Sequence, residues 1–281
     1  MKPAIIGIAG PALTPDERQL LRDHAPRGVI LFSRNIQLPS QLYDLNAEIK
    51  SLLPQNAILM VDQEGGRVAR LRPPHWPVLP PAGRLNSAAE AYAHGKALGA
   101  MVKAAGFTMT AAPVLDLSIA GASGVIGDRA ITGGPEQVAL FGGEIARGIM
   151  DEGILPVMKH IPGHGRALLD SHLALPHVAV NDEDDHLPFI RNKDLPWAMT
   201  AHIVYEQWDR ERAATISPIV IEKIIRGKIG FTGQLMSDDL AMHAISGTPK
   251  QRALAALAAG CDVALYCPGD FAGNRQILEA L

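Results

Sequence analysis

The sequence predicts an α/β protein that folds as a single (β/α)8 barrel of the TIM type over residues 1–281. Eight short apolar runs recur along the chain, each followed by Gly, Pro or polar residues and then by a stretch with helical spacing. Continuous apolar runs are typical of strands that are covered on both faces, as in a parallel sheet. Eight strand–helix units in 281 residues also fit the usual size of such a barrel, about 250 residues.

The expected strands are the apolar runs, in chain order 4–10, 28–33, 57–63, 107–117, 155–161, 197–203, 234–240 and 262–267. Helical spacing lies between them, for example over 135–150 and 218–225. Ser217 suits the N-cap of the second of these helices, and Pro218 suits its first position. After the eighth run little more than DFAGNRQILEAL remains, so we expect a short or truncated last helix.

Two other architectures fit less well. A doubly wound open sheet usually has a glycine-rich phosphate-binding turn after its first strand, whereas GIAGPALT at 7–14 contains a proline and lacks the full fingerprint. A two-domain arrangement would need a linker, but no composition shift divides the chain. We interpret the proline-dense segment 72–81 as one rigid loop after the third strand.

Composition and charge exclude several classes of protein. The chain is 47% hydrophobic and 20% charged, as in ordinary globular proteins, and its net charge of −3 offers no basic surface for nucleic acid. The N-terminal apolar run is short and broken by Pro11, and no segment has the roughly 20 apolar residues of a membrane span. We expect no membrane partner and a cytoplasmic location, with Cys261 and Cys267 reduced and buried.

Ionisable side chains stand at the ends of five of the eight expected strands. They are Asp62, Asp116, Lys159 with His160, His202, and Asp238 with Asp239. Buried charged groups are paired or functional, and barrel enzymes build their active sites at the C-terminal ends of the strands. We therefore expect these side chains to line one cleft.

The segment KHIPGHGRALLDSHLALPHV at 159–178 holds four of the ten histidines, which suggests either a metal site or acid–base chemistry. Zinc would need several imidazoles that converge on one ion. His160 and His164 are four residues apart, but the proline and glycine between them break the helix that would align them. No HxH follows the first strand and HExxH occurs nowhere, so we expect no metal and no other cofactor.

Acid–base chemistry needs a nucleophile or base and a separate proton donor. Asp238 in SDDL would point into the barrel mouth and could attack a sugar carbon. Alternatively it caps the helix expected next, although Asp239 is better placed for that role. In Asp170-Ser171-His172 the imidazole could exchange protons near neutral pH while Asp170 holds one ring nitrogen. The alternative is an exposed turn that contains a histidine by chance.

Five motifs together resemble glycoside hydrolase family 3: KHIPGHG, DSHLALP, MSDDLAM, VDQEGGRVARLR at 61–72 and GVIGDRA at 124–130. DSH marks the bacterial cytoplasmic β-N-acetylglucosaminidase branch of that family, which acts in peptidoglycan recycling. The resemblance implies a retaining exo-β-N-acetylglucosaminidase that needs no metal or cofactor. Its implied substrate is the terminal β-linked GlcNAc of GlcNAc–anhydroMurNAc peptides, and we expect a monomer without nucleic-acid or membrane partners.

Carried over to this sequence, the resemblance makes Asp238 the nucleophile that forms a covalent glycosyl-enzyme, and His172 the general acid/base oriented by Asp170. A histidine thus replaces one of the two carboxylates of most retaining glycosidases. Asp62 can accept hydrogen bonds from sugar hydroxyls, and cations can donate to hydroxyl, acetamido or carboxylate oxygens. The implied substrate contacts are Asp62, Arg70, Arg129, Lys159 and His160.

Several alternatives stay open. A neutral base would not repel an anion, so phosphate could replace water as the acceptor, and another β-linked amino sugar could be the substrate. The chain could also be a metal-dependent barrel hydrolase that uses the histidine cluster, or a barrel that binds sugars without catalysis.

Neighbouring residues are expected in structural roles. We expect Arg67 to pair with Glu64 and His164 to shape its loop, and Arg166 stands where many relatives have an acidic or small polar residue. The histidines expected to be exposed are His24, His94, His177 and His186.

Overall fold

The structure, a computed structural model, describes residues 1–122, 124–169, 175–180, 182–242 and 245–281. Within these residues nine strands form one parallel sheet, in the order β5-β4-β3-β2-β1-β11-β10-β8-β6. They are β1 (Lys2–Gly7), β2 (Pro26–Leu31), β3 (Ile58–Val61), β4 (Met109–Thr110), β5 (Leu155–Pro156), β6 (Met158–Ile161), β8 (Trp197–Thr200), β10 (Gln234–Asp239) and β11 (Val263–Tyr266). Each predicted run overlaps one of these strands or, at 155–161, two. The short strands β7 (His177–Val178) and β9 (Val204–Tyr205) pair separately.

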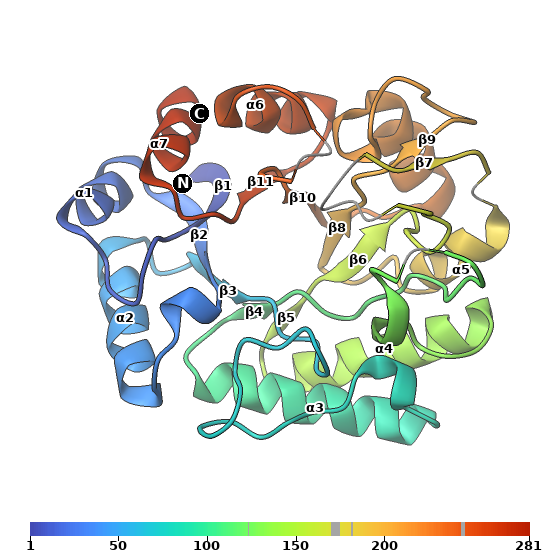
Figure 1. Cartoon of the computed structure of the whole chain (residues 1–281), viewed down its shortest axis with the longest axis horizontal. Coiled ribbons are helices and arrows are strands. Elements are labelled where there is room, and N and C mark those ends of the chain that lie inside the picture. Colours follow the sequence, from blue (N-terminus) through green and yellow to red (C-terminus); the bar gives the residue numbers. More distant parts are fainter. Residues whose placement is uncertain (123, 170–174, 181, 243–244) are drawn as a thin grey trace.

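The sheet closes into a barrel between the chain segments around Pro113 and Lys159 (Figure 1). β5 pairs with β4, β6 pairs with β8, and only Val157 separates β5 from β6. The N–H of Lys159 donates to the carbonyl of Pro113 (3.1 Å), and the N–H of Leu115 donates to the carbonyl of Lys159 (2.7 Å). The predicted (β/α)8 barrel is therefore confirmed, and the open doubly wound sheet is excluded.

Helices surround the strands on the outside of the barrel (Figure 1). They are α1 (Pro15–His24), α2 (Pro39–Leu52), α3 (Ala88–Ala104), α4 (Pro135–Asp151), α5 (Glu183–Arg191), the π-type helix η5 (Val220–Ile229), α6 (Pro249–Ala259) and α7 (Phe271–Ala280). α4 and η5 overlap the helices predicted over 135–150 and 218–225. The Ser217 hydroxyl accepts the N–H of Val220 (3.2 Å), and residues 218–219 are already helical, so Ser217 stands at the start of this helix as predicted. The last helix, α7, is short as expected, with ten residues.

The helix expected directly after β10 is a wrong prediction. Residues 240–242 form a turn, and α6 begins only at Pro249. In that turn Oδ1 of Asp239 accepts the N–H of Ala241 (3.0 Å) and also that of Cys267 (3.0 Å). Asp239 therefore links the end of β10 to the end of β11, which leaves the neighbouring Asp238 for another role.

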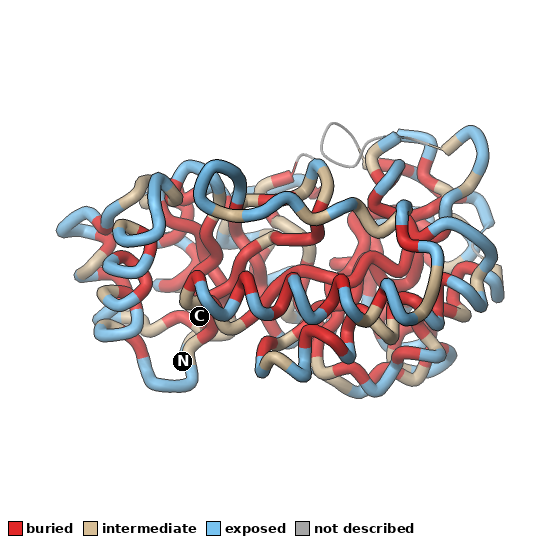
Figure 2. The backbone as a smooth tube through the Cα atoms, turned by 90° about the horizontal axis from the view of Figure 1, so that it is seen from below, coloured by how far each residue is buried: buried red, intermediate tan, exposed pale blue. Residues whose placement is uncertain are grey.

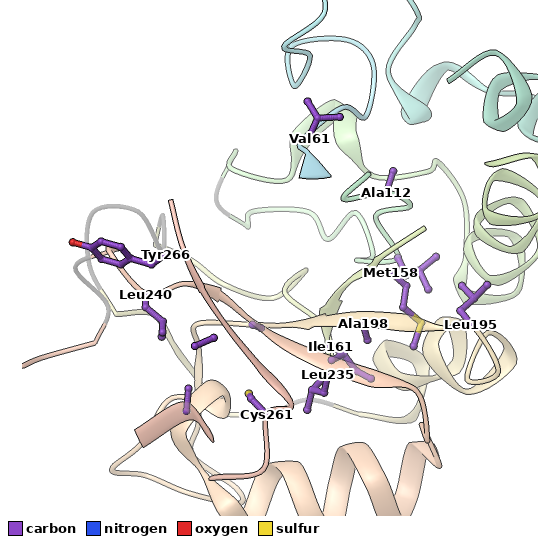
Figure 3. Close-up of a cluster of buried hydrophobic side chains, with 14 of the residues drawn as sticks. Val61, Ala112, Met158, Ile161, Leu195, Ala198, Leu235, Leu240, Cys261 and Tyr266 are labelled. Carbon is purple, nitrogen blue, oxygen red and sulfur yellow. The ribbon is translucent and has the colours of Figure 1, made fainter. Parts of the chain in front are cut away.

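Two apolar cores hold the barrel together. Alternate strand positions point inward and meet at its centre, among them Ile5, Met60 and Leu265. The intervening positions pack outward against the helices, as Figure 3 shows for Met158 and Leu235. Buried backbone accordingly occupies the middle of the molecule, and exposed positions recur along its periphery (Figure 2).

Both cysteines are free and buried, as predicted. In the described part of the chain, no helix combines the length and the apolar character needed to cross a bilayer.

Candidate active site

A cavity of about 440 Å³ lies where the C-terminal ends of the strands meet. Its walls are partly apolar, with Phe32, Met60, Met199, Met242 and Leu265. The predicted nucleophile and substrate contacts that the structure describes all line this cavity: Asp62, Arg70, Arg129, Lys159, His160 and Asp238. Asp239 lines it as well, but Asp116 and His202, which were also expected to line the cleft, are fully buried and do not. The predicted acid/base pair, Asp170 and His172, lies outside the described residues.

The turn after β3 carries two carboxylates: Asp62 lines the cavity, and Glu64 pairs with the cavity-lining Arg129 and Lys159. The N–H groups of Glu64 and Gly65 both donate to the carbonyl of Val68 (2.8 and 3.2 Å), so the chain reverses here. Gly65 and Gly66 have φ angles of +102° and +56°, in the region that favours glycine. A Cβ atom on Gly66 would also lie only 2.6 Å from Cβ of Pro81. The two glycines therefore allow the tight return that brings Arg70 back beside Asp62.

Five charged side chains form a continuous network at one wall of the cavity; four of them line it, and Glu64 pairs with two of these. Asp62 accepts hydrogen bonds from Arg70 (2.7 Å) and from Lys159 (2.9 Å). Glu64 pairs with Lys159 (2.6 Å) and accepts two hydrogen bonds from the Arg129 guanidinium (2.8 Å each). Because three cations face two carboxylates, the network carries a net positive charge.

The groups of this network stay charged at neutral pH. Burial opposes the ionisation of Asp62 and Glu64, but Lys159, with Arg70 at Asp62 and Arg129 at Glu64, holds the pKa of both carboxyls below the usual range. Burial also opposes the charge on Lys159, but the two carboxylates raise its pKa. Charged donors and acceptors are thus available for hydrogen bonds to a polar ligand.

A second buried carboxylate, Asp116, holds two histidines at the cavity. Nδ1 of His160 lies 2.6 Å from Oδ2 of Asp116, and the N–H of His164 donates to Oδ1 (2.7 Å). Burial alone would raise the pKa of Asp116, but the neighbouring imidazoles lower it to about 2. Burial and the nearby His160 lower the pKa of His164 to about 4, so His164 is neutral at pH 7.

Asp238 lies at the end of β10, and its carboxylate is ionised. Burial opposes its ionisation, but the imidazoles of His202 and His160 lower its pKa. Its main-chain N–H donates to Oγ1 of Thr200 (3.3 Å), and its Oδ1 accepts the N–H of Asp239 (2.8 Å). These contacts place an anionic carboxylate oxygen, a possible nucleophile, in the same cavity as the charged network.

His202 is fixed by its two ring nitrogens. Nδ1 lies 2.7 Å from the Thr215 hydroxyl, and Nε2 lies 2.9 Å from the carbonyl of Asp239. The carbonyl can only accept, so Nε2 carries the proton. Burial lowers the pKa of His202, which favours this neutral form.

The expected pair between Arg67 and Glu64 is wrong. Arg67 pairs instead with Asp128 (3.0 Å) and donates to the carbonyls of Gly124 and Ile126 (3.1 Å each), while half of its side chain stays exposed. Glu64 is buried and takes the equally buried Arg129 and Lys159 as partners. The position of Glu64 in the DQEGGRV motif was the available signal for its role in the site.

Two histidines that were expected to be exposed are buried. His94 is 6% exposed and His186 is fully buried, because both lie on the inner faces of helices, whereas His177 is exposed as predicted. Arg166 pairs with Asp182 (2.7 Å) and Asp185 (2.6 Å) at the start of α5. Among the described residues, no group of three or more His, Cys, Asp or Glu side chains is arranged to hold a metal ion.

The parallel barrel and the ionised carboxylate beside a wall of charged hydrogen-bonding groups fit an enzyme of the glycoside hydrolase class. The chain belongs to glycosyl hydrolase family 3, because residues 6–281 match the N-terminal domain of that family. The family membership predicted from the motifs is therefore confirmed.

Curated relatives support the same family. A beta-hexosaminidase from Methylococcus capsulatus is 41% identical over 288 residues, which cover 98% of this chain and 85% of the relative. A beta-hexosaminidase from Pseudomonas aeruginosa is 40% identical over 287 residues, which cover 99% of this chain and 85% of the relative.

Solved structures have the same fold. NagZ from Neisseria gonorrhoeae, in complex with N-trifluoroacetyl-D-glucosamine, is 34% identical with a TM-score of 0.88, covering 99% of this chain and 88% of that one. A family 3 beta-N-acetylglucosaminidase from Paenibacillus sp. is 32% identical with a TM-score of 0.91, covering 99% of this chain and 56% of that one.

Proposed function

We propose that the chain is a retaining exo-β-N-acetylglucosaminidase that removes terminal β-linked N-acetylglucosamine. The observation that supports this proposal most strongly is that Asp238, an ionised carboxylate, shares its cavity with Asp62, Lys159 and Arg129, which Glu64 joins into one charged network. The cavity of about 440 Å³ lies within the usual range for small-molecule sites. Relatives that carry the name beta-hexosaminidase point to the same activity.

In the proposed first step, a carboxylate oxygen of Asp238 attacks C1 of the sugar, and the bond from C1 to the leaving oxygen breaks. The leaving oxygen takes a proton from the His172 imidazolium. In the second step, a water gives a proton to His172 and attacks C1, which releases the sugar and restores Asp238. Asp170 would hold the imidazole; both loop residues are assigned from the DSH motif and lie outside the described residues.

The charged network would bind the hydroxyls and the acetamido group of the sugar. Lys159 has three ammonium donors, and within the described residues Asp62 and Glu64 accept two of them, which leaves one for a substrate oxygen. Asp62, Arg70, Arg129 and His160 would provide the other contacts. A sugar that lacks a matching group would leave a donor or acceptor of the network without a hydrogen-bond partner, and this mismatch selects against it.

The stereochemistry of hydrolysis tests this proposal. Proton NMR of an aryl β-N-acetylglucosaminide reaction should show the β-anomer of N-acetylglucosamine first, because two displacements at C1 retain its configuration. An α-anomer as the first product, or no turnover, would contradict the proposal. Full activity in EDTA would agree with metal-free catalysis, whereas loss in EDTA and recovery with Zn²⁺ would favour a metal-dependent hydrolase.

The natural substrate that we propose is a GlcNAc–anhydroMurNAc peptide released during peptidoglycan recycling, which would place a monomeric enzyme in the cytoplasm. Release of GlcNAc from purified anhydromuropeptides, and an enrichment of these compounds in cells that lack the protein, would support it. Adding phosphate distinguishes the acceptor: water gives free N-acetylglucosamine in every buffer, whereas a phosphorylase would give the sugar 1-phosphate.

A further inference from the structure

His94 reaches from α3 to the turn that carries Glu64. Its Nε2 lies 3.1 Å from the main-chain carbonyl oxygen of Glu64, and the side chain is only 6% exposed. A carbonyl oxygen can only accept a hydrogen bond, so Nε2 must carry the proton. Nδ1 is then an acceptor, and burial lowers the pKa of the ring, which favours this neutral form.

A small cavity lies beside the same histidine. Its volume of about 10 Å³ is close to the space that one water needs. His94, Glu64 and Arg129 are among its lining residues, so it borders the ion pair at the wall of the larger cavity. Among the described residues Nδ1 has no hydrogen-bond partner, and a buried acceptor without a donor is unfavourable.

The neighbouring glycine shows how closely His94 is packed against the turn. A Cβ atom on Gly65 would lie 3.1 Å from Cε1 of His94 and 2.4 Å from the carbonyl oxygen of Pro80. The turn is therefore held between the imidazole on one side and the proline-dense segment 72–81 on the other. A change at His94 would allow the main chain at Glu64 to move.

We propose that His94 is a positioning residue for the charged network, and that one water bound in the small cavity donates a hydrogen bond to its Nδ1. His94 acts through Glu64: the Nε2 proton fixes the main chain at Glu64, and the Glu64 carboxylate in turn holds Arg129 and Lys159. The effect of His94 on substrate binding rests on the proposed function, whereas the hydrogen bonds of its ring do not.

The kinetic test compares His94→Leu with His94→Gln. Leucine removes the donor, so KM for an aryl β-N-acetylglucosaminide should rise about tenfold while kcat stays within about twofold, because the groups that we propose the network binds, the hydroxyls and the acetamido group, take no part in the bond changes at C1. Glutamine has an N–H donor at a similar distance from its backbone, and KM should return to within about threefold of the wild-type value. An unchanged KM in His94→Leu would overturn the proposal.

Asn46→Leu is the matched control. Asn46 is a buried residue of α2 whose side-chain amide donates to the carbonyl of Ala105 (2.8 Å), and it does not line the catalytic cavity. Its substitution removes the same kind of bond and should lower Tm without changing KM. An equal rise in KM in both variants would show that His94 acts only on global stability, which would also overturn the proposal.

Two measurements on the wild-type protein need no activity. Nitrogen-15 NMR of histidine-labelled protein should show His94 as the Nε2–H tautomer, and a high-resolution crystal structure should show density for a water within about 3.2 Å of Nδ1. An Nδ1–H tautomer, or a cavity without density, would overturn the proposal. Because these readouts are independent of turnover, an inactive enzyme would contradict the proposed function alone.

Discussion

Nδ1 of His160 lies 2.6 Å from Oδ2 of Asp116, a carboxylate with no exposed surface. The same carboxylate accepts the main-chain N–H groups of His160 (3.2 Å) and His164 (2.7 Å). One buried anion therefore orients a cavity-lining imidazole and also fixes the chain that carries it.

Asp116→Asn should reduce kcat/KM for an aryl β-N-acetylglucosaminide by about tenfold to a hundredfold, because it replaces a charge-assisted hydrogen bond to His160 with a neutral one.

The same substitution should change the pH dependence of stability. Since the folded pKa of about 2 lies below the unfolded value of about 3.9, Asp116 stabilises the fold above pH 4, and this contribution is lost as the pH falls towards 2. Between pH 5 and pH 2.5 the free energy of unfolding, measured with a denaturant, should therefore fall less in Asp116→Asn than in wild type. An equal fall in both proteins would show that Asp116 is not a group that titrates in this window.

Glu64→Gln should lower the free energy of unfolding by about 3–5 kcal/mol, because it leaves Lys159 and Arg129 buried with too little negative charge. Chemical denaturation measures this loss. The control is Glu48→Gln, which breaks the partly exposed pair with Arg18 and should lower the free energy of unfolding far less, because water screens that pair. Similar losses of unfolding free energy in the two variants would show that the contribution of these ion pairs to stability does not depend on their burial.

Asp238→Ala should reduce kcat by about 10⁴-fold or more, because the covalent intermediate cannot form without the nucleophile. Mass spectrometry of the wild-type enzyme with a slow substrate should also find one sugar attached to Asp238. Asp239→Asn is the control, since Asp239 contacts main-chain N–H groups and should affect stability more than kcat. Wild-type turnover in Asp238→Ala would remove the nucleophile assignment.

His172→Ala should slow the hydrolysis of substrates with poor leaving groups far more than that of activated aryl substrates, because only the former need a proton from the enzyme. A plot of log kcat/KM against leaving-group pKa should become steeper. His177→Ala removes an exposed histidine that lies 3.2 Å from Glu206 and should leave the plot unchanged. Equal losses on all substrates would argue against a general acid at His172.

His186→Phe should stabilise the protein in mild acid. Both ring nitrogens of His186 lack a hydrogen-bond partner among the described residues. The ring packs against Trp208, with 5.4 Å between the two ring centroids. Burial lowers its folded pKa to about 4, below an unfolded value of about 6.5, so the fold loses stability as the pH falls from 6.5 to 4. The unfolding free energy of His186→Phe should fall less over this window than that of wild type; an unchanged slope would show that His186 is not the titrating group.

The positions of the site residues along the chain were predictable to a large extent. The apolar runs at 57–63, 155–161 and 234–240 predicted strands, and the ionisable residues at their ends predicted a common cleft. This inference holds because the C-terminal ends of parallel strands meet at one end of a barrel, whatever the distance between them in sequence. The partners of each charge were not predictable in the same way, and Arg67 with Glu64 is the example.

The burial of His94 and His186 was also missed. His94 lies among alanines and glycines in α3, and His186 lies in the polar helix α5. Small or polar neighbours mark the buried face of a helix only weakly, so the sequence did not distinguish these histidines from ones that face solvent. Residues 240–242 illustrate the same limit, since the contacts of Asp239 with Ala241 and Cys267 form a turn where local spacing favoured a helix.

The sequence by itself determined the barrel, the family and most of the charged residues that line the cavity, because apolar periodicity and strand-end chemistry are local properties of the chain. Only the tertiary structure decided that Glu64 joins Arg129 to Lys159, that Asp116 holds His160, and that His94 supports the turn at Glu64. Charges and buried hydrogen-bond donors take whichever partners folding brings within about 3 Å, and those partners come from distant parts of the chain.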